Sequence, residues 1–367
     1  MMRIKFILLT VLMVVSCNPS EDMPPENVDD FDRQAMLTEW ADNIIIPAYD
    51  NHLSKLQAFR EVLVAWQNDQ SLTQLNELRN QWKQVYLSWQ YATIFEIGRA
   101  EALMMRGFMN TYPTDTSAII ANISDASVNL SLPSTADAQG LPAFDFLLYG
   151  LAENDTDIVT RLADPLYTAY LQKLVDRMID LTSEVLDDWN GTYRNDFVQN
   201  VASSATGSVD KLVNDYVYYY ERHLRAGKVG IPAGVFSGKI EAQTVEALYA
   251  GDFSKELLLQ AIDISQDFFN GQTQINSSAS SLGLADYLDY LNTIKETEDL
   301  TALINAQFDA AREKAQQLQD DFVDQLESDP TVMLEVYDEL QKNVVLLKVD
   351  LMQALNVRVD YVDADGD

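Results

Sequence analysis

Apolar residues spaced alternately four and three positions apart constrain the fold of this chain more than any other feature. The clearest stripe consists of Met333, Tyr337, Leu340, Val344, Leu347 and Leu351. This spacing predicts a long helix with one apolar face, because an α-helix turns once in 3.6 residues. Residues 304–322 repeat the spacing. With a short turn at 328–330, the two segments are expected to form an antiparallel pair, the unit of an up-and-down bundle.

The rest of the chain is also predicted to be helical. The same periodicity recurs over residues 33–67, 72–107 and 158–189, with an interruption near Pro47. Alternation typical of a strand is convincing only near the C-terminus, at Val357, Val359 and Tyr361, where it predicts a short β-extension. We therefore expect an all-α fold.

The N-terminal segment is predicted to be a lipoprotein signal peptide over residues 1–16. Arg3 and Lys5 precede an apolar run, and Val14-Val15-Ser16-Cys17 resembles a bacterial lipobox. Cys17, the only cysteine, is the expected lipid attachment site that anchors the protein to a membrane of the bacterial cell envelope. A single cysteine excludes a disulfide framework. Residues 17–35 are acidic and Pro-rich, as expected for a solvated tether.

The chain is strongly acidic. Its 57 Asp and Glu against 25 Lys and Arg give a formal charge of −32. Such a field repels nucleic acids and anionic lipid surfaces, and it favours cations or a basic protein partner. Because 47% of the residues are hydrophobic and 22% charged, the chain is able to bury a large core, so the acidity belongs to its surface.

Sequence motifs for most catalytic sites are missing. The two histidines, His52 and His223, lie outside any HExxH motif, and no phosphate-binding Gly-rich loop or GxSxG motif occurs. We interpret both histidines as surface or boundary residues. A Ser-His-Asp triad assembled from distant residues stays open, without a feature that favours it.

Carboxylates are the remaining candidates for chemistry. Hard cations such as calcium or iron accept oxygen ligands alone, so acids on facing helices are able to hold a metal ion. Glu96 and Glu101 precede a long irregular stretch at 108–142, and Asp145 follows it. A second irregular stretch covers 225–240. Most acids on helices are nevertheless solvated surface groups.

The two irregular stretches carry a similar phrase. Gly140-Leu141-Pro142-Ala143 in the first matches Gly230-Ile231-Pro232-Ala233 in the second. Pro shortly after Gly predicts a turn or a helix start. This similarity is compatible with an internal duplication of the chain but is too short to establish one. The three consecutive tyrosines at 218–220 lie about 100° apart on a helix, so at least one ring leaves the core-facing stripe and is available to line a cleft.

Several phrases resemble the imelysin family of envelope proteins, and the resemblance extends from about residue 36 to the C-terminus. They lie at 95–98, 110–115, 140–150, 228–236, 245–247, 348–350 and 361–367. The resemblance implies two pseudo-symmetric up-and-down helical bundles with a cleft between them. The expected domains are an N-terminal bundle over 36–200 and a C-terminal bundle with a short acidic tail over 201–367.

The resemblance also implies a site. The family signature is Gly-x-His-x-x-Glu, in which Gly140 matches the Gly, Pro142 replaces the His and Asp145 replaces the Glu. Pro has no ligand atom and no proton to transfer, so a mechanism that depends on this histidine is lost. We expect ligand-binding residues at Glu96, Gly140, Pro142, Asp145, Gly230 and Pro232. Glu96 and Asp145 are the expected ligands of a metal ion, iron or calcium.

The sequence thus predicts an envelope lipoprotein that acts as a non-catalytic binding protein in iron or haem acquisition. A metallopeptidase, as the founding member of the family was described, is the first alternative. The second is a structural or adhesive surface module that recognises a basic partner through the acidic field. No catalytic residue is assigned.

Overall fold

The computed structural model describes residues 29–275, 281–295 and 298–361. The predicted signal segment, Cys17, most of the tether and the acidic residues after Tyr361 lie outside these ranges. One compact unit, Asp32–Asp367, contains every helix and strand of the described residues. The fold is all-α, as predicted.

The helices of the first half follow one another with short connections. They are α1 (Arg33–Glu39), η1 (Trp40–Ile45), α2 (Ile46–Asn68), α3 (Leu72–Ala92), α4 (Arg99–Ala102), α5 (Met105–Met109), α6 (Thr116–Ile123), η2 (Pro133–Ala138), α7 (Gly140–Asp145), η3 (Phe146–Gly150), α8 (Asp155–Leu162), α9 (Pro165–Asp188), η4 (Trp189–Tyr193) and α10 (Arg194–Gln199). Here η2 is a 3-10 helix, and η1, η3 and η4 are π-helical.

The second half contains the remaining elements. They are α11 (Ser208–Tyr218), η5 (Tyr219–Gly230), η6 (Ala242–Thr244), α12 (Ser254–Phe269), α13 (Leu284–Tyr290), β1 (Ile294–Lys295), β2 (Glu298–Asp299), α14 (Leu300–Ala315), α15 (Phe322–Ser328), α16 (Thr331–Val345), η7 (Leu346–Leu351) and α17 (Met352–Ala354). The π-helical segments η5 and η7 continue α11 and α16 without a break, and η6 is a 3-10 helix.

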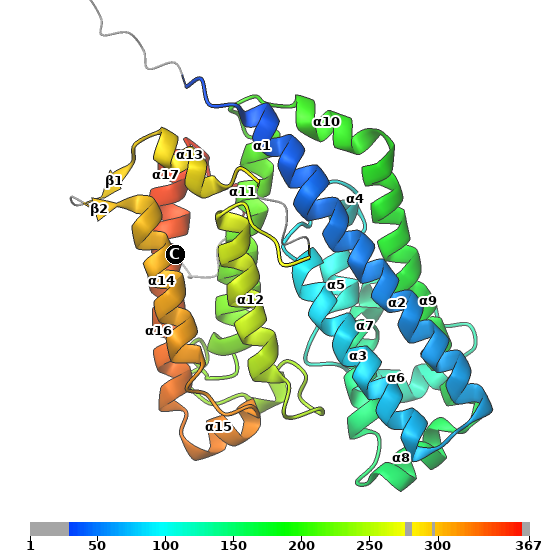
Figure 1. The fold of residues 1–367 in the computed structure, drawn as a ribbon. Coiled ribbons are helices and arrows are strands. Elements are labelled where there is room, and N and C mark those ends of the chain that lie inside the picture. Colours follow the sequence, from blue (N-terminus) through cyan, green and yellow to red (C-terminus); the bar gives the residue numbers. More distant parts are fainter. Residues whose placement is uncertain (1–28, 276–280, 296–297, 362–367) are drawn as a thin grey trace, which may run out of the picture. The chain divides into compact units, whose positions relative to one another are not determined.

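In the first half, α2 packs along both α3 and α9 (Figure 1). The apolar face of α2 explains this arrangement. Leu56, Phe59, Leu63 and Trp66 follow the helical spacing, and each is almost fully buried. The interruption expected near Pro47 occurs as η1 just before it, because Pro has no N–H to donate.

The second half is built around α14 and α16, which pack against each other as the periodicity predicts. Further contacts join α12 to α14 and η5 to α16. The connection differs from the expected short turn, since α15 lies between the two helices. Leu318 and Phe322 extend the apolar pattern past the end of α14, and both are buried.

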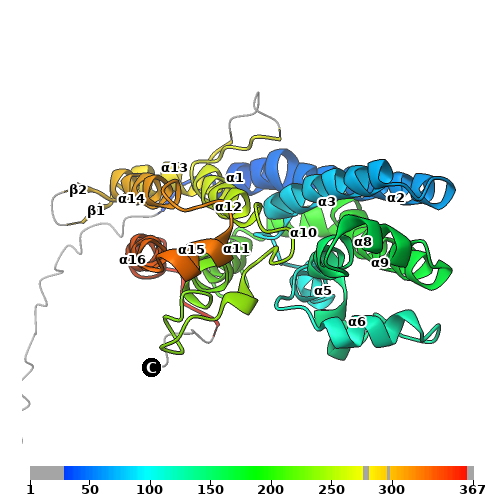
Figure 2. The same cartoon turned by 90° about the horizontal axis from the view of Figure 1, so that it is seen from below.

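The two halves share a core where α3 lies beside α12 (Figures 1 and 2). The rings of Trp82 and Phe253 are 5.6 Å apart, and those of Phe95 and Phe268 are 5.3 Å apart. Aromatic residues from both halves therefore pack in one apolar layer.

Three details differ from the sequence predictions. His52 is fully buried rather than at the surface or a boundary, and its Nδ1 lies 2.8 Å from Ser88 Oγ. The expected strand near Val357 is absent from residues 357–361, where Asn214 bonds the backbone instead. A two-residue antiparallel pair, β1 with β2, occurs where no strand was expected. Within the described ranges, no helix is long and apolar enough to cross a membrane.

Candidate functional site

A pocket of about 270 Å³ lies between the two halves of the chain. We call it the seam pocket. It is lined by Glu96, Ile97, Glu101 and Arg106 from the first half and by Lys211, Asn214, Asp215, Tyr218, Asp360 and Tyr361 from the second. Because each half supplies part of the wall, the pocket exists only when both halves are folded together.

The wall of the seam pocket contains a buried cluster of three charges. The Arg106 guanidinium contacts the Glu96 carboxylate (Nη1 to Oε2, 3.0 Å) and both Asp215 oxygens (Nη2 to each, 3.1 Å). The backbone N–H of Arg106 donates to Glu96 Oε1 at 2.6 Å, and that of Glu96 donates to Asp215 Oδ2 at 2.6 Å. One cation therefore serves two carboxylates and ties the halves together.

Burial sets the electrostatics of this cluster. The side chains of Arg106, Asp215 and Glu96 are 5%, 12% and 19% exposed. Burial raises the pKa of Glu96 to about 7, although the Arg106 charge opposes the shift. The pKa of Asp215 is also raised by burial, again against Arg106. The single charge of Arg106 thus does not fully offset the effect of burial on the pKa of the two carboxylates.

A break in the helical path places these groups. After α3 ends at Ala92, Gly98 takes a positive φ of 59°, where a Cβ would lie 2.3 Å from the Tyr193 ring. Met104 is also left-handed, with φ of 53°, and starts α5. The predicted long helix over 72–107 is therefore wrong beyond Ala92. The break turns Glu96 and Arg106 toward each other.

The mouth of the seam pocket is more exposed. Glu101, Lys211 and Asp360 are exposed, and Tyr218 is half-buried with its ring 5.2 Å from that of Tyr361. As expected for the three consecutive tyrosines, one ring leaves the core: Tyr219 and Tyr220 are buried, whereas Tyr218 lines the pocket.

Asn214 holds the C-terminal segment beside the pocket. Its Nδ2 donates to the Arg358 carbonyl at 2.9 Å, and its Oδ1 accepts from the Asp360 N–H at 3.0 Å. Tyr361 Oη donates to Glu221 Oε2 at 3.0 Å. These bonds make residues 358–361 a fixed wall of the pocket.

A second pocket of about 260 Å³ lies beside α7, and we call it the α7 pocket. It is lined by Tyr112, Pro113, Thr114, Thr116, Pro142, Asp145, Gln243, Val245, Ala247, Leu248 and Tyr249. Asp145 is 2% exposed, and its two oxygens accept the N–H groups of Tyr249 and Ala250, each at 2.9 Å. Burial raises its pKa to about 7, although the two N–H groups oppose the shift. Asp145 therefore fixes the loop after Ala247.

A buried ion pair lies close to Asp145. Lys228 of η5 pairs with Glu246, and both side chains are less than 5% exposed. Glu246 Oε1 also accepts from Asn110 Nδ2 at 2.8 Å, and Asn110 accepts from the Tyr86 hydroxyl at 2.6 Å. Burial lowers the pKa of Lys228. Val245 and Ala247, on either side of Glu246 in the chain, line the α7 pocket together with Asp145, and the negative charge of Glu246 adds to the rise in the pKa of Asp145 that burial causes.

The structure does not bring the expected site residues into one site. Glu96 lines the seam pocket, whereas Pro142 and Asp145 line the α7 pocket. Glu96 has Arg106 as its partner, whereas Asp145 has backbone N–H groups, so the two carboxylates have different surroundings. Within the described ranges, no group of three or more His, Cys, Asp or Glu residues is arranged to hold a metal ion.

The expected glycine and proline sites act on the backbone. Gly140 has φ of 73°, and a Cβ there would lie 2.3 Å from the Met109 carbonyl oxygen. Gly230 ends η5 against the Tyr337 ring, and the Pro232 carbonyl accepts the Glu241 N–H at 2.9 Å. Of these three positions, only Gly140 adjoins a described pocket, through Pro142 and Asp145 of its own helix.

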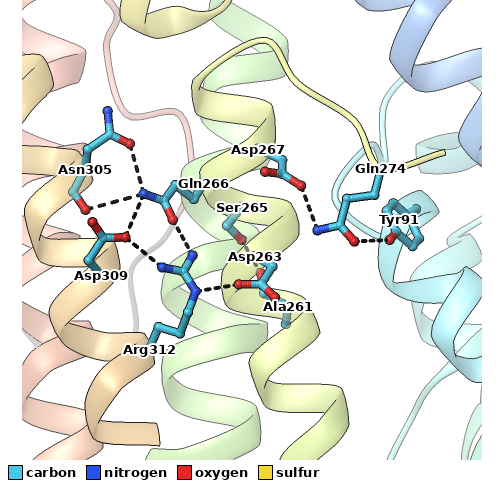
Figure 3. Close-up of polar contacts among 10 residues, drawn as sticks. All are labelled: Tyr91, Ala261, Asp263, Ser265, Gln266, Asp267, Gln274, Asn305, Asp309 and Arg312. Carbon is cyan, nitrogen blue, oxygen red and sulfur yellow. Dashed lines mark hydrogen bonds and ion pairs between the residues drawn. The ribbon is translucent and has the colours of Figure 1, made fainter. Parts of the chain in front are cut away.

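A third polar network joins α12 to its neighbours (Figure 3). Arg312 of α14 donates to Asp309 and to Asp263, while Gln266 Nε2 donates to Asn305 Oδ1 at 3.0 Å. On the other side of α12, Gln274 donates to Asp267 at 3.0 Å and accepts from the Tyr91 hydroxyl at 3.1 Å. Asp263 and Gln274 also line an open surface pocket beside α12, but each polar group of this network has a partner on a neighbouring element, so we assign the network a structural role.

Sequence reasoning missed Arg106, Asp215, Lys228 and Glu246. A signal existed for the two bases, because each sits among apolar residues and glycine in a chain poor in Lys and Arg. Arg106 is preceded by two methionines, and Lys228 lies between Gly227 and Val229. A base in such a context predicts a buried charge with an acidic partner. Asp215 and Glu246 carry no comparable local signal.

Comparisons with known proteins identify relatives. The imelysin family model matches residues 45–348. An imelysin-like protein from Psychrobacter arcticum 273-4 has the same fold, with a TM-score of 0.69 and 19% identity over 90% of this chain and 97% of the other. A protein from Parabacteroides distasonis ATCC 8503 described as an iron-regulated protein A precursor gives a TM-score of 0.67 and 15% identity, over 89% and 96%. No curated protein sequence matches the chain.

Proposed function

Because the chain belongs to the imelysin family, we propose that it is a cell-envelope binding protein, without a catalytic role, that takes part in iron or haem acquisition. The observation that carries the proposal is the seam pocket. A buried Arg106 shared by Glu96 and Asp215 forms a rigid polar wall that opens to a cavity of about 270 Å³. Such a wall fixes and orients a ligand.

The chemistry of the two pockets supports binding over catalysis. Asp145 has both oxygens bonded to backbone N–H groups and so holds a loop. Glu96 holds the Arg106 N–H and guanidinium. In each case both oxygens of the carboxylate with the raised pKa contact groups of its own chain, which favours a positioning role over that of a general base.

The link to iron rests on relatives. The name of the structural neighbour from Parabacteroides distasonis refers to iron regulation, and the family resemblance points the same way. The predicted lipid anchor at Cys17 and the predicted signal over residues 1–16 supply the envelope location of this proposal. A tether over 17–35 would then hold the folded unit away from an anionic membrane surface that its own charge repels.

Calorimetry with the full chain tests the proposal. Ferric citrate, calcium and haemin are titrated separately, and bound metal is quantified by elemental analysis. We expect saturable binding of an iron compound that Asp215→Asn weakens at least tenfold and that Asp145→Asn leaves within twofold. Asp145→Asn is the matched control, because it also neutralises a buried acid, in the other pocket.

Two results would overturn the proposal. The first is the absence of saturable binding of any iron compound. The second is cleavage of a protein substrate that a chelator stops and that Asp145→Ala abolishes, which would support the metallopeptidase alternative. Salt-sensitive binding to a basic protein, unaffected by chelators, would support an adhesive module instead.

A further inference from the structure

We propose that the seam pocket binds a small organic cation, with an ammonium or guanidinium group placed between the mouth acids Glu101 and Asp360 and the buried cluster of Glu96, Arg106 and Asp215. This inference rests on one part of the proposed function, that the seam pocket is a binding site, and does not depend on the iron role. The ligand would supply positive charge to a pocket whose lining contains more acids than bases.

The charge balance of the lining is the first argument. Four acids line the pocket, Glu96, Glu101, Asp215 and Asp360, against two bases, Arg106 and Lys211. When every group is ionised, at a pH above the Glu96 pKa of about 7, four negative and two positive charges leave the lining two charges negative. Glu101 also raises the pKa of both Glu96 and Asp215, so its charge reaches the buried cluster. A ligand cation placed here relieves repulsion among acids from both halves.

The second argument is the built wall. Arg106 is 5% exposed and held by the Thr93 carbonyl as well as by the two carboxylates. The pocket is therefore a fixed cavity with a buried ionic floor, and this distinguishes it from acids that only line a solvated helix. Its volume of about 270 Å³ is near the lower end for small-molecule sites.

The third argument selects an organic cation. The fixed Arg106 already occupies the space between Glu96 and Asp215, where a compact metal ion would need both carboxylates as ligands. A guanidinium or ammonium group bonds instead to single oxygens at the mouth. The half-buried ring of Tyr218 lies on the same wall, and an aromatic face attracts organic cations.

Calorimetry with agmatine, which carries a guanidinium and an ammonium group, tests this inference on the full chain. N-butylurea serves as the neutral analogue. The test variant is the double mutant Glu101→Gln/Asp360→Asn, whose exposed positions leave the fold intact. The control, Glu61→Gln/Asp69→Asn, removes the same two charges from exposed positions that do not line the pocket.

We expect saturable binding of agmatine to the unmodified chain and no detectable binding of N-butylurea. The affinity for agmatine should fall at least tenfold in the pocket variant and stay within twofold in the control. Binding should also weaken from pH 8 to pH 5.5, because Glu96, with its pKa of about 7, gains a proton. Equal losses in both variants, binding of N-butylurea, or no agmatine binding would overturn the inference. Agmatine binding without any iron compound would contradict only the proposed iron role, and iron binding without agmatine only the ligand class.

Discussion

Glu96 and Asp145 are two carboxylates whose pKa is raised to about the same value in different surroundings. Burial raises the pKa of each to about 7. Glu96 faces a guanidinium in a pocket built from both halves, whereas Asp145 accepts two backbone N–H groups of one loop. A raised pKa alone therefore does not identify a functional acid. The two acids differ in their partners, which are a guanidinium for Glu96 and backbone N–H groups for Asp145.

The comparison implies different responses to mutation. The cluster of Glu96, Arg106 and Asp215 depends on one shared cation, so removing that cation should be costly. Asp145 depends on neutral donors, so removing its charge while keeping its shape should cost less. The predictions below run from the largest expected effect to the smallest.

Arg106→Ala should produce the largest loss of stability. It leaves Glu96 and Asp215 buried together without a cation, and breaking a buried ion pair in this way costs about 3–5 kcal/mol. Urea unfolding followed by circular dichroism at pH 7.5 measures the change in the free energy of unfolding. Arg99→Ala is the control, because Arg99 is 42% exposed and pairs with exposed Glu184, which is worth about 0–1 kcal/mol. Equal losses of stability in the two variants would contradict this prediction, because they would show that Glu96 and Asp215 do not need the Arg106 charge more than an exposed acid needs its partner.

Gly140→Ala should rank second and tests the backbone beside Asp145. The position has φ of 73°, and the new Cβ would lie 2.3 Å from the Met109 carbonyl oxygen. Backbone strain of this kind costs roughly 1–3 kcal/mol, and the contact with the backbone adds to it. The melting temperature measures the loss. Gly107→Ala on α5 is the control, since nothing lies within 4 Å of its Cβ, and it should be neutral or stabilising.

The all-α fold followed from the sequence because helical spacing is local. Residues 46–68 and 331–351 became helical as their apolar stripes predicted, apart from their π-helical stretches. The site did not follow, because its geometry depends on where helices break. Gly98 and Met104 adopt left-handed conformations that redirect Glu96 and Arg106, and periodicity over 72–107 contains no trace of that turn.

Long-range pairing explains the remaining misses. Asp215 meets Arg106 from 109 positions away in sequence, and Glu246 meets Lys228 across an irregular loop. A single sequence identifies Arg106 as a base in an apolar context, yet it does not specify which of 57 acids will approach it. Glu96 and Asp145, expected as joint ligands, line different pockets for the same reason. The similar phrases at Gly140 and Gly230 gave no information about which helices pack together.

Asp145→Asn should have a smaller effect, of about 1–2 kcal/mol. The amide offers one acceptor oxygen, so one of the N–H groups of Tyr249 and Ala250 meets an NH₂ group instead. The folded-state pKa of Asp145 is raised from 3.8 to about 7, so the stability it contributes is complete below pH 4 and is lost as the pH rises through 7. The variant should therefore lose more stability at pH 5 than at pH 8, as measured by urea unfolding. An equal loss at both values would mean that Asp145 does not titrate in this range.

Glu101→Gln should have the smallest effect and the most selective one. Glu101 is exposed, so the free energy of unfolding should change by no more than about 0.5 kcal/mol. Its charge nevertheless raises the pKa of Glu96, and it is not among the groups that shift Asp145. Neutralising it should lower the Glu96 pKa by a few tenths of a unit, because a weaker negative field favours the ionised form. Carboxyl ¹³C NMR titration measures both acids in one sample. A shift at Glu96 with none at Asp145 would establish that the two carboxylates titrate in separate electrostatic environments, whereas a common shift would join the seam pocket and the α7 pocket into one coupled site.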